Sequence, residues 1–270
     1  MKYFFLIFFG LFCFTLHAQD MKRIDSLKNK LRYAKEDTAK ASLLNYIGWA
    51  YHNYIPDTTL YYVQQAYNLA KEAGDKRNMA FAKYYMGKMY YTKSNDSASI
   101  SNYTEAIALF EEIKNIGMLS TAHMQMGYTY HHQSRYADVL NEYMLALKYA
   151  EQSEDKSKIS DALYSLSDYY LHSESRSDAE VLKAEPYLLQ ALAIDKELNN
   201  KSSIASDYQY LGVCYTLLGR YKEAEQNLLQ GLQMFKDLKD NFHTGAVCSY
   251  LGNLYDATGN YDKSISYLLQ

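Results

Sequence analysis

Met126-Gly127-Tyr128-Thr129-Tyr130 is one of six copies of a short pattern in this chain of 270 residues. In each copy an aliphatic residue or Met precedes Gly or Ser, and Tyr follows three residues later. The small residue advances by 39, 40, 40, 45 and 40 positions from one copy to the next. A period of this length indicates a solenoid, whose units cannot bury their own apolar faces and must stack on neighbours. The other copies are Ile47-Gly48 with Tyr51, Met86-Gly87 with Tyr90, Leu166-Ser167 with Tyr170, Leu211-Gly212 with Tyr215, and Leu251-Gly252 with Tyr255.

Within each unit the apolar spacing is helical. In the third unit, two amphipathic stretches are separated by the polar residues Gln133-Ser134-Arg135, which predicts a helix, a tight turn and a second helix. The second stretch of most units carries a small residue at a matching place: Ala66, Ala106, Ala146, Ala191 and Gly231. We therefore expect the backbones of the two antiparallel helices to approach closely at these small residues, with the motif tyrosine filling the space beside the contact.

This pattern resembles the tetratricopeptide repeat (TPR) family, which places aliphatic–Gly–x–x–Tyr on the first helix of each unit and small residues on the second. The units repeat at 39 to 45 residues, so they are similar to a long variant of the usual 34-residue unit. The Trp that family members carry four residues before the Gly is absent here. The resemblance covers residues 37–270 and implies an all-α fold, a right-handed α-solenoid of stacked helix-turn-helix units.

The N-terminal residues predict export. Lys2 supplies a positive charge, residues 4–16 are apolar, and Ala18 offers a small residue at a cleavage site. We interpret residues 1–19 as a signal peptide cleaved near Ala18/Gln19, which predicts a periplasmic location. A lipoprotein signal at Cys13 is the alternative, although Leu11 and Phe12 are bulky where that signal needs a small residue. No second apolar run of spanning length follows.

The rest of the chain divides into a predicted capping helix over residues 20–36 and six repeats over residues 37–270, with the sixth truncated. The long fourth interval predicts a lengthened connection at residues 173–178, with a partner-binding loop as the alternative. Pro186 is expected near the start of the following helix, where its missing N–H costs little. We expect the chain to continue beyond Gln270, because a solenoid needs a polar cap at its end.

Composition argues against several functions. The formal net charge is −3, without a basic patch, so no nucleic-acid partner is expected in this region, and membrane contact only through a segment downstream of residue 270. Cys214 and Cys248 fall on helical positions too far apart for a disulfide and are interpreted as small core residues. No catalytic or phosphate-binding motif is present. His132 and His172 are the pair nearest to a shared metal position, without further ligands. We therefore expect no enzyme activity, metal or cofactor.

The resemblance also implies a binding surface. With the Gly or Ser numbered 8, TPR proteins direct positions 5, 9, 12 and 13 of the first helix into a concave groove. The predicted peptide-groove residues are Asn45, Trp49, His52, Asn53, Tyr84, Lys88, Tyr91, Met124, Tyr128, His131, His132, Tyr164, Asp168 and His172. Gln209, Val213, Ser249 and Asn253 continue this row. Rings and amides suit a peptide or protein segment. The alternative is that several rings only cover neighbouring helices, because the chain holds 30 tyrosines.

The leading hypothesis is a protein–protein interaction scaffold, the exported sensory part of a longer signalling protein. The chain resembles the exported N-terminal TPR region of bacterial sensor histidine kinases, and this resemblance implies the signalling role. The second hypothesis is a free periplasmic TPR adaptor or assembly protein without a catalytic partner domain.

Overall fold

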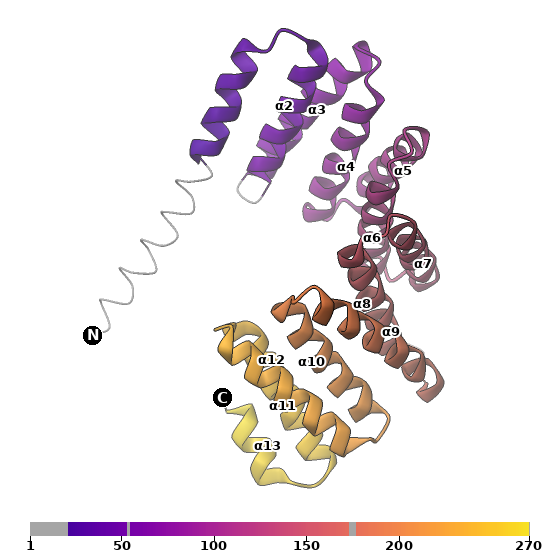
Figure 1. The fold of residues 1–270 in the computed structure, drawn as a ribbon, viewed down its shortest axis with the longest axis vertical. Coiled ribbons are helices and arrows are strands. Elements are labelled where there is room, and N and C mark those ends of the chain that lie inside the picture. Colours follow the sequence, from indigo (N-terminus) through magenta and orange to yellow (C-terminus); the bar gives the residue numbers. More distant parts are fainter. Residues whose placement is uncertain (1–20, 53–54, 173–176, 270) are drawn as a thin grey trace, which may run out of the picture. The chain divides into compact units, whose positions relative to one another are not determined.

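A computed structural model describes residues 21–52, 55–172 and 177–269 of the chain. The described residues form helices joined by short turns and contain no strand (Figure 1). The chain divides into two compact units, Met1–Ser134 and Arg135–Gln270. The predicted signal peptide at residues 1–19 lies outside the described residues.

In the first unit a helix over residues 21–33 precedes five further helices. Their bounds are α2 Asp37–Tyr51, α3 Pro56–Glu72, α4 Lys76–Thr92, α5 Asp96–Glu112 and α6 Ile116–His132. Within this unit, successive helices from α2 to α6 pack together, and α4 also contacts α2 and α6. Ile24 of the first helix is fully buried with Ile47 and Tyr51 of α2.

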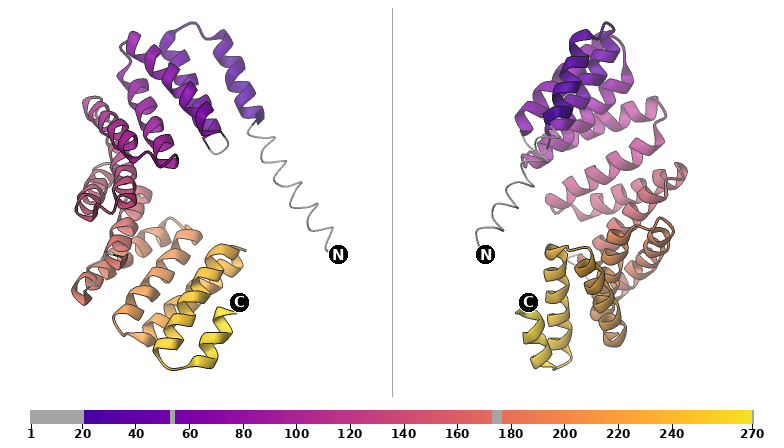
Figure 2. Two further views of the ribbon diagram at one scale, coloured as in Figure 1. Left: turned by 180° about the vertical axis from the view of Figure 1, so that it is seen from behind. Right: turned by 60° about the vertical axis from the view of Figure 1, so that its left-hand side comes forward.

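The second unit repeats this arrangement (Figures 1 and 2). Its helices are α7 Tyr136–Gln152, α8 Lys156–His172, α9 Asp178–Glu197, α10 Lys201–Leu217, α11 Tyr221–Asp237, α12 Asn241–Ala257 and α13 Tyr261–Leu268. Successive helices pack together, and α10 also contacts α8 and α12. The predicted all-α fold of stacked helix-turn-helix units is therefore confirmed.

Several turns between helices share one design, in which a residue in the left-handed conformation is followed by Asn or Asp. After α5, Lys114 adopts the left-handed conformation with φ 54°, and the Asn115 N–H donates to Phe110 O at 2.9 Å. The Asn115 side chain then accepts from Met118 N and caps α6. Such a turn satisfies the last carbonyls of one helix and the first N–H groups of the next. Turns of the same form at Gly74-Asp75, Ser94-Asn95, Asn199-Asn200, Lys239-Asp240 and Gly259-Asn260 set the spacing of the helices.

Lys114→Gly is expected to raise the free energy of unfolding by about 0.5–1 kcal/mol, because glycine occupies the left-handed region without the steric cost of a Cβ. Urea unfolding followed by circular dichroism measures the change. The control is Ala108→Gly on the exposed face of α5, which is expected to lower stability by about 1 kcal/mol. A loss of stability in Lys114→Gly would contradict the turn geometry.

The small residues of the repeated motif lie where two helices meet. A Cβ added at Gly212 on α10 would stand 2.5 Å from Leu228 Cγ and 3.2 Å from Ala224 O on α11. At Gly87 on α4, it would stand 2.8 Å from the Tyr103 ring on α5. The expected close approach of paired helices at these residues is therefore confirmed.

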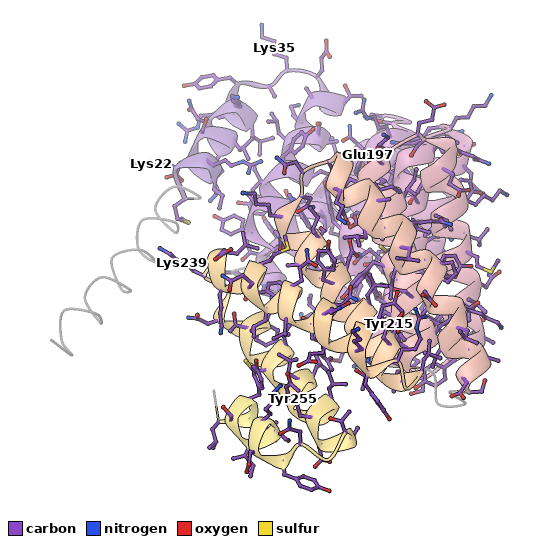
Figure 3. The ribbon with its side chains drawn as sticks, turned by 60° about the horizontal axis from the view of Figure 1, so that its bottom comes forward. Lys22, Lys35, Glu197, Tyr215, Lys239 and Tyr255 are labelled. Atoms are coloured by element: carbon purple, nitrogen blue, oxygen red, sulfur yellow. The ribbon has the colours of Figure 1, made fainter. Side chains whose placement is uncertain are left out.

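Two motif tyrosines, Tyr215 and Tyr255, link their repeat to the one before it. The Tyr215 hydroxyl on α10 donates to Glu185 Oε1 on α9 at 3.1 Å, and Arg220 binds the same carboxylate. The Tyr255 hydroxyl on α12 donates in the same way to Glu225 on α11. Figure 3 labels both tyrosines. These rings therefore fill the space beside the helix contacts and also tie neighbouring repeats together.

The five extra residues of the fourth interval are divided between a turn and a helix. The connection from α8 to α9 holds residues 173–177, and residues 173–176 lie outside the described residues. α9 itself has 20 residues, compared with 17 in most other helices, and begins with a capping box at Ser177 and Glu180. The prediction of a longer connection alone was therefore incomplete.

The expectation for Pro186 was wrong. It lies inside α9, well beyond the first turn, instead of near the start of the helix. A proline there leaves the Leu182 carbonyl without its helical N–H partner. Leu182 and Pro186 are both exposed, so this carbonyl lies on the side of α9 that water reaches.

The core of the second unit contains both cysteines. Cys214 is fully buried and Cys248 is 2% exposed, and neither forms a disulfide. The prediction that both are small core residues is confirmed. Burial raises the pKa of the Cys214 thiol to about 12, so this thiol is not a reactive nucleophile. Across the described ranges, none of the helices combines the length and the apolar character that a membrane crossing requires.

Candidate functional site

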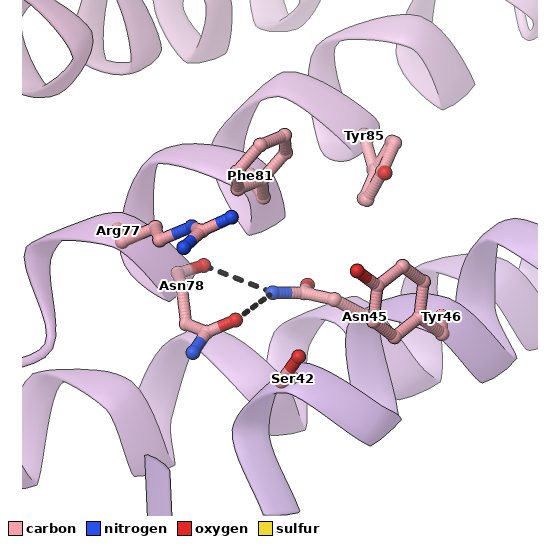
Figure 4. Close-up of a pocket in the computed structure, with 7 residues that line it drawn as sticks. All are labelled: Ser42, Asn45, Tyr46, Arg77, Asn78, Phe81 and Tyr85. Carbon is pink, nitrogen blue, oxygen red and sulfur yellow. Dashed lines mark hydrogen bonds between the residues drawn. The ribbon is translucent and has the colours of Figure 1, made fainter. Parts of the chain in front are cut away.

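The first unit contains a pocket of about 320 Å³ between α2 and α4. Ser42, Asn45 and Tyr46 line it from α2, at spacings of three and four residues that place them on one face of the helix. Arg77, Asn78, Phe81 and Tyr85 line it from α4 (Figure 4). This volume is at the lower end of the range for small-ligand pockets.

Asn45 is held in place at this pocket by its amide nitrogen. Asn45 Nδ2 donates to Asn78 O at 3.0 Å and to Asn78 Oδ1 at 3.3 Å (Figure 4). Asn78 is fixed in turn by Asp75. The Asp75 carboxylate accepts hydrogen bonds from the backbone N–H and from the side-chain amide of Asn78. Asn45 is only 4% exposed, and its Oδ1 accepts no hydrogen bond from any described residue. A buried acceptor without a partner costs about 1–3 kcal/mol, which a ligand N–H would recover.

A cationic group and two aromatic rings complete the pocket. The exposed Arg77 guanidinium lies beside Phe81, and within the described ranges Arg77 forms no ion pair. Phe81 and Tyr85 stand next to one another along α4, with ring centroids 6.2 Å apart. The pocket therefore offers an anion-binding group, an amide acceptor and an apolar wall.

Tyr85 joins this pocket to an aromatic cluster around Trp49. The Trp49 ring stacks on His52 at 3.7 Å and on Tyr85 at 5.0 Å between centroids. Lys88 Nζ lies 4.6 Å from the centre of the Trp49 ring, a cation–π contact. We call Trp49, His52, Tyr85 and Lys88 the Trp49 cluster.

The charges of the Trp49 cluster are set by partial burial. Burial lowers the pKa of His52, and the nearby Lys88 lowers it further. The imidazole is therefore neutral at pH 7, and its Nδ1 lies 2.6 Å from the Trp49 carbonyl oxygen. Burial also lowers the pKa of Lys88. Burial raises the pKa of Tyr85 to about 12, so its hydroxyl keeps its proton and remains a hydrogen-bond donor.

The structure places the other predicted groove residues of the first unit at different depths. Tyr91 contacts the ring of His132, and His132 Nδ1 lies 2.8 Å from Asp96 Oδ2. Tyr128 is half-buried and His131 is exposed. Tyr84 and Met124 are buried, at 7% and 8% exposure, and Tyr84 packs against Tyr103 and Tyr85 in the interior. Asn53 lies outside the described residues.

In the second unit the predicted residues Tyr164, Asp168 and His172 gather around Tyr210. The rings of Tyr164 and Tyr210 meet edge to face at 4.7 Å, and His172 Nδ1 lies 3.0 Å from Asp168 Oδ1. Burial raises the pKa of Tyr210, and the Asp168 carboxylate adds to this effect. In the two following repeats, Gln209 on α10 is 5% exposed, whereas Ser249 and Asn253 on α12 are exposed.

A row of tyrosines two residues before the motif glycine was not predicted from the sequence. Tyr46, Tyr85, Tyr210 and Tyr250 occupy this place. The first three are more exposed than the residues just before them, Asn45, Tyr84 and Gln209, whereas Tyr250 is less exposed than Ser249. The recurrence of Tyr two positions before Gly was the available signal. Arg77, Asn78 and Phe81 were also missed, since they precede the motif by more than a helical turn.

The described residues offer binding chemistry and little else. No group of three or more His, Cys, Asp or Glu side chains within them converges on a point where a metal ion would bind. His132 and His172 each face a carboxylate on their own unit, Asp96 and Asp168 respectively. Aromatic walls, amides and single charges are groups that hold a ligand in one orientation.

Repeated helix pairs, with motif glycines such as Gly87 and Gly212 at their contacts, define an α-helical repeat fold. Residues 179–237 match the family described as "Tetratricopeptide repeat", which confirms the predicted resemblance to that family. A comparison with curated protein sequences found no match.

Solved structures share this fold. The apo form of RapI is 15% identical, with a TM-score of 0.70, over 100% of this chain and 96% of that one. A signal transduction ATPase (STAND) protein with a tetratricopeptide repeat sensor from Pyrococcus horikoshii is 17% identical, with a TM-score of 0.78, over 94% of this chain and 39% of that one. A Rap protein complexed with competence and sporulation factor is 18% identical, with a TM-score of 0.57, over 93% of this chain and 74% of that one. At these identities the likeness is one of fold.

Proposed function

We propose that this chain is a protein-interaction scaffold that holds a peptide or protein segment on the first unit, along α2 and α4. The observation that carries the proposal is Asn45, which lines a pocket together with aromatic rings and Arg77 and whose buried Oδ1 has no partner among the described residues. A Rap protein of the same fold has been solved with competence and sporulation factor bound, which supports a protein or peptide ligand.

The pocket chemistry defines the kind of segment. Asn45 Oδ1 accepts a hydrogen bond from a backbone N–H of the ligand. The Arg77 guanidinium binds a carboxylate, either an acidic side chain or a terminal carboxyl group. Apolar side chains of the ligand lie on Phe81, Tyr85 and Trp49, where rigid rings provide contact area at little entropic cost.

Binding of short synthetic peptides to the full chain tests this proposal. Each peptide is prepared with a free and with an amidated carboxyl terminus, with and without acidic residues, and affinities are measured by fluorescence anisotropy. Arg77→Gln is expected to weaken binding of carboxylate-bearing peptides by about tenfold or more and to leave the neutral peptides unchanged. Trp49→Ala is expected to weaken both classes by about 30-fold, as at a central aromatic contact.

Arg32→Gln is the matched control, since Arg32 is an exposed arginine of the same unit and does not line the pocket. Circular dichroism establishes that each variant stays helical. Tyr84 is not a suitable substitution, because it is buried in the helix interior. The proposal fails if Arg77→Gln and Trp49→Ala bind every peptide as well as the parent chain does.

We further propose that the chain is exported to the periplasm and serves as the sensory part of a longer signalling protein, such as a sensor histidine kinase. The apolar stretch at residues 4–16 supports export. The Pyrococcus protein of similar fold carries a tetratricopeptide repeat region described as a sensor. Ligand binding would act by favouring one curvature of the repeats over another, and the change would be relayed along the chain.

Two measurements test the proposed export and the proposed signalling role. Cell fractionation followed by N-terminal sequencing of the mature protein is expected to find it in the periplasm, beginning near Gln19. The gene beyond the codon for Gln270 is expected to encode a membrane span and a kinase module. The second candidate function is a free periplasmic adaptor or assembly protein, which predicts only a further repeat and a capping helix there.

A further inference from the structure

The second unit contains a polar cavity of about 180 Å³ that the proposed peptide site does not use. It lies among α8, α9 and α10 and carries three carboxyl groups, those of Asp161, Asp195 and Asp207. The remaining lining residues are Ser160, Tyr164, Ser202, Ser203 and Ser206. Every polar side chain here offers an oxygen, and none of these side chains carries a nitrogen donor.

Two of the three carboxyl groups are buried. Asp195 is 3% exposed and Asp207 is 1% exposed, whereas Asp161 lies at the exposed rim. Ser160 Oγ donates to Asp195 Oδ2 at 2.6 Å, which fixes that carboxylate. Asp207 Oδ2 accepts no hydrogen bond from any described residue. A buried carboxyl oxygen without a donor is costly, so the cavity lacks a group that would satisfy it.

The two nearest lysines do not supply that group. Lys158 forms an ion pair with Asp155, and Lys196 Nζ lies over the Tyr208 ring at 5.2 Å. Within the described ranges, none of the three cavity carboxylates is in ion-pair contact with a Lys, Arg or His side chain. Among the described residues, the cavity therefore gathers three carboxyl groups without a cationic side chain paired to them.

A metal ion does not fit this donor set. A divalent metal needs several oxygen ligands converging within about 2.0–2.6 Å of one point, and no described group of His, Cys, Asp and Glu side chains meets that requirement. An organic ammonium group has three N–H donors that bind at ordinary hydrogen-bond distances of about 2.8 Å. It can also use the serine hydroxyls as acceptors.

We propose that the cavity formed by Asp161, Asp195 and Asp207 binds a primary ammonium group, with the unpartnered Asp207 Oδ2 as one of its acceptors. The group could be carried by a peptide amino terminus or by an alkylamine such as a lysine side chain, which share this chemistry. The serines on the first turns of α10 surround the carbon atoms next to the charged nitrogen.

This assignment predicts that binding releases a proton. Burial raises the pKa of Asp207 to about 8, and the adjacent Asp195 carboxylate raises it further, while Lys196 opposes the shift. Asp161 on α8 is the third carboxyl group of the cavity, and its pKa is raised by partial burial and by Asp195 and Asp155, while Lys158 opposes the shift. An empty cavity therefore holds a proton on Asp207 at pH 7, and an entering ammonium group displaces it.

Calorimetric titration of the full chain with three small probes tests the proposal. The probes are n-butylamine, L-alaninamide and N-acetyl-L-alaninamide, which present an alkylammonium, a peptide-like amino terminus and a blocked amino terminus. Both free amines are expected to bind, and the acetylated compound is not expected to bind. Tighter binding of n-butylamine identifies an alkylamine as the source of the ammonium group, and tighter binding of L-alaninamide identifies a peptide amino terminus. n-Butylamine stays charged below pH 9, so its affinity is expected to rise by roughly tenfold or more from pH 6 to pH 8, with proton release that differs between buffers.

Asp207→Asn and Asp161→Asn are each expected to weaken n-butylamine binding by about tenfold or more, and Asp207→Asn abolishes the proton release. Asp237→Asn on α11 is the matched control, since it removes a carboxylate outside the cavity and is expected to change nothing. The proposal is overturned if no free amine binds, or if N-acetyl-L-alaninamide binds as well as the free amines do. It is also overturned if calcium chloride binds and excludes the amines, or if Asp237→Asn weakens binding as much as the cavity variants do. Loss of peptide binding on the first unit leaves these outcomes unaffected.

Discussion

Asp207→Asn is expected to make the protein more stable at pH 8, by several kcal/mol and about 5 at most, although a carboxyl group has been removed. The physical reason is the position of Asp207, which is 1% exposed and adjacent to the buried Asp195. Burial raises its pKa from the ordinary value of 3.8 to about 8. Ionising Asp207 in the folded chain is therefore costly, and the neutral amide of Asn avoids that cost.

The sign of the pH dependence follows from this shift. Between about pH 4 and pH 8 the unfolded chain has lost the Asp207 proton while the folded chain keeps it, so the free energy of unfolding falls as pH rises. Urea unfolding of the parent chain at intervals from pH 5 to pH 8 measures this slope. The variant is expected to show a flatter profile, and Asp237→Asn, a surface control on α11, is expected to follow the parent. Equal slopes in the parent and in Asp207→Asn would contradict a raised pKa.

Gly212→Ala is expected to destabilise the second unit by about 1–3 kcal/mol, the usual cost of forcing an extra carbon into a packed contact. Alanine is the better helix former, so helix propensity alone predicts the opposite sign. The added Cβ would meet the Leu228 side chain at 2.5 Å and the Ala224 carbonyl at 3.2 Å, and a backbone atom cannot move aside without shifting α11.

Gly245→Ala provides the opposite case on α12. A Cβ at Gly245 meets nothing within 4 Å, and the residue is exposed. This substitution is expected to stabilise the chain by about 0.5–1 kcal/mol through helix propensity alone. Thermal unfolding of both variants, followed by circular dichroism, measures the difference. If both substitutions change stability in the same direction, the motif glycine is not needed for close helix packing.

Much of the fold could be predicted from the recurrence of one short motif. A small residue with Tyr three residues later recurs six times, and this recurrence predicted paired helices. The predicted close helix contact at Gly212 is present. These features depend on spacing along a helix and on side-chain size, which a sequence states directly. Trp49, His52 and Lys88, three of the predicted groove residues, lie in contact with one another, since they belong to the first helices of adjacent repeats.

Depth below the surface could not be predicted in the same way. Adjacent positions on a helix differ by roughly 100° around its axis, so a small error in the assumed rotation exchanges a buried position for an exposed one. For this reason Tyr84 was expected on the surface and is buried, while Tyr85 was missed and lines the pocket. Pro186 was misplaced for a related reason, because the start of α9 depends on a capping box at Ser177 that the repeat does not predict.

The sequence by itself determined the local design of this protein, namely the helices, their pairing and the glycine contacts, because these arise from residues close together along the chain. Only the tertiary structure decided which polar groups are buried without partners. Asn45 Oδ1 and Asp207 Oδ2 are ordinary helix-surface atoms in the sequence, and they are unsatisfied only because neighbouring helices exclude water from them. The cost of such burial depends on every element packed around the atom, and no local pattern records it.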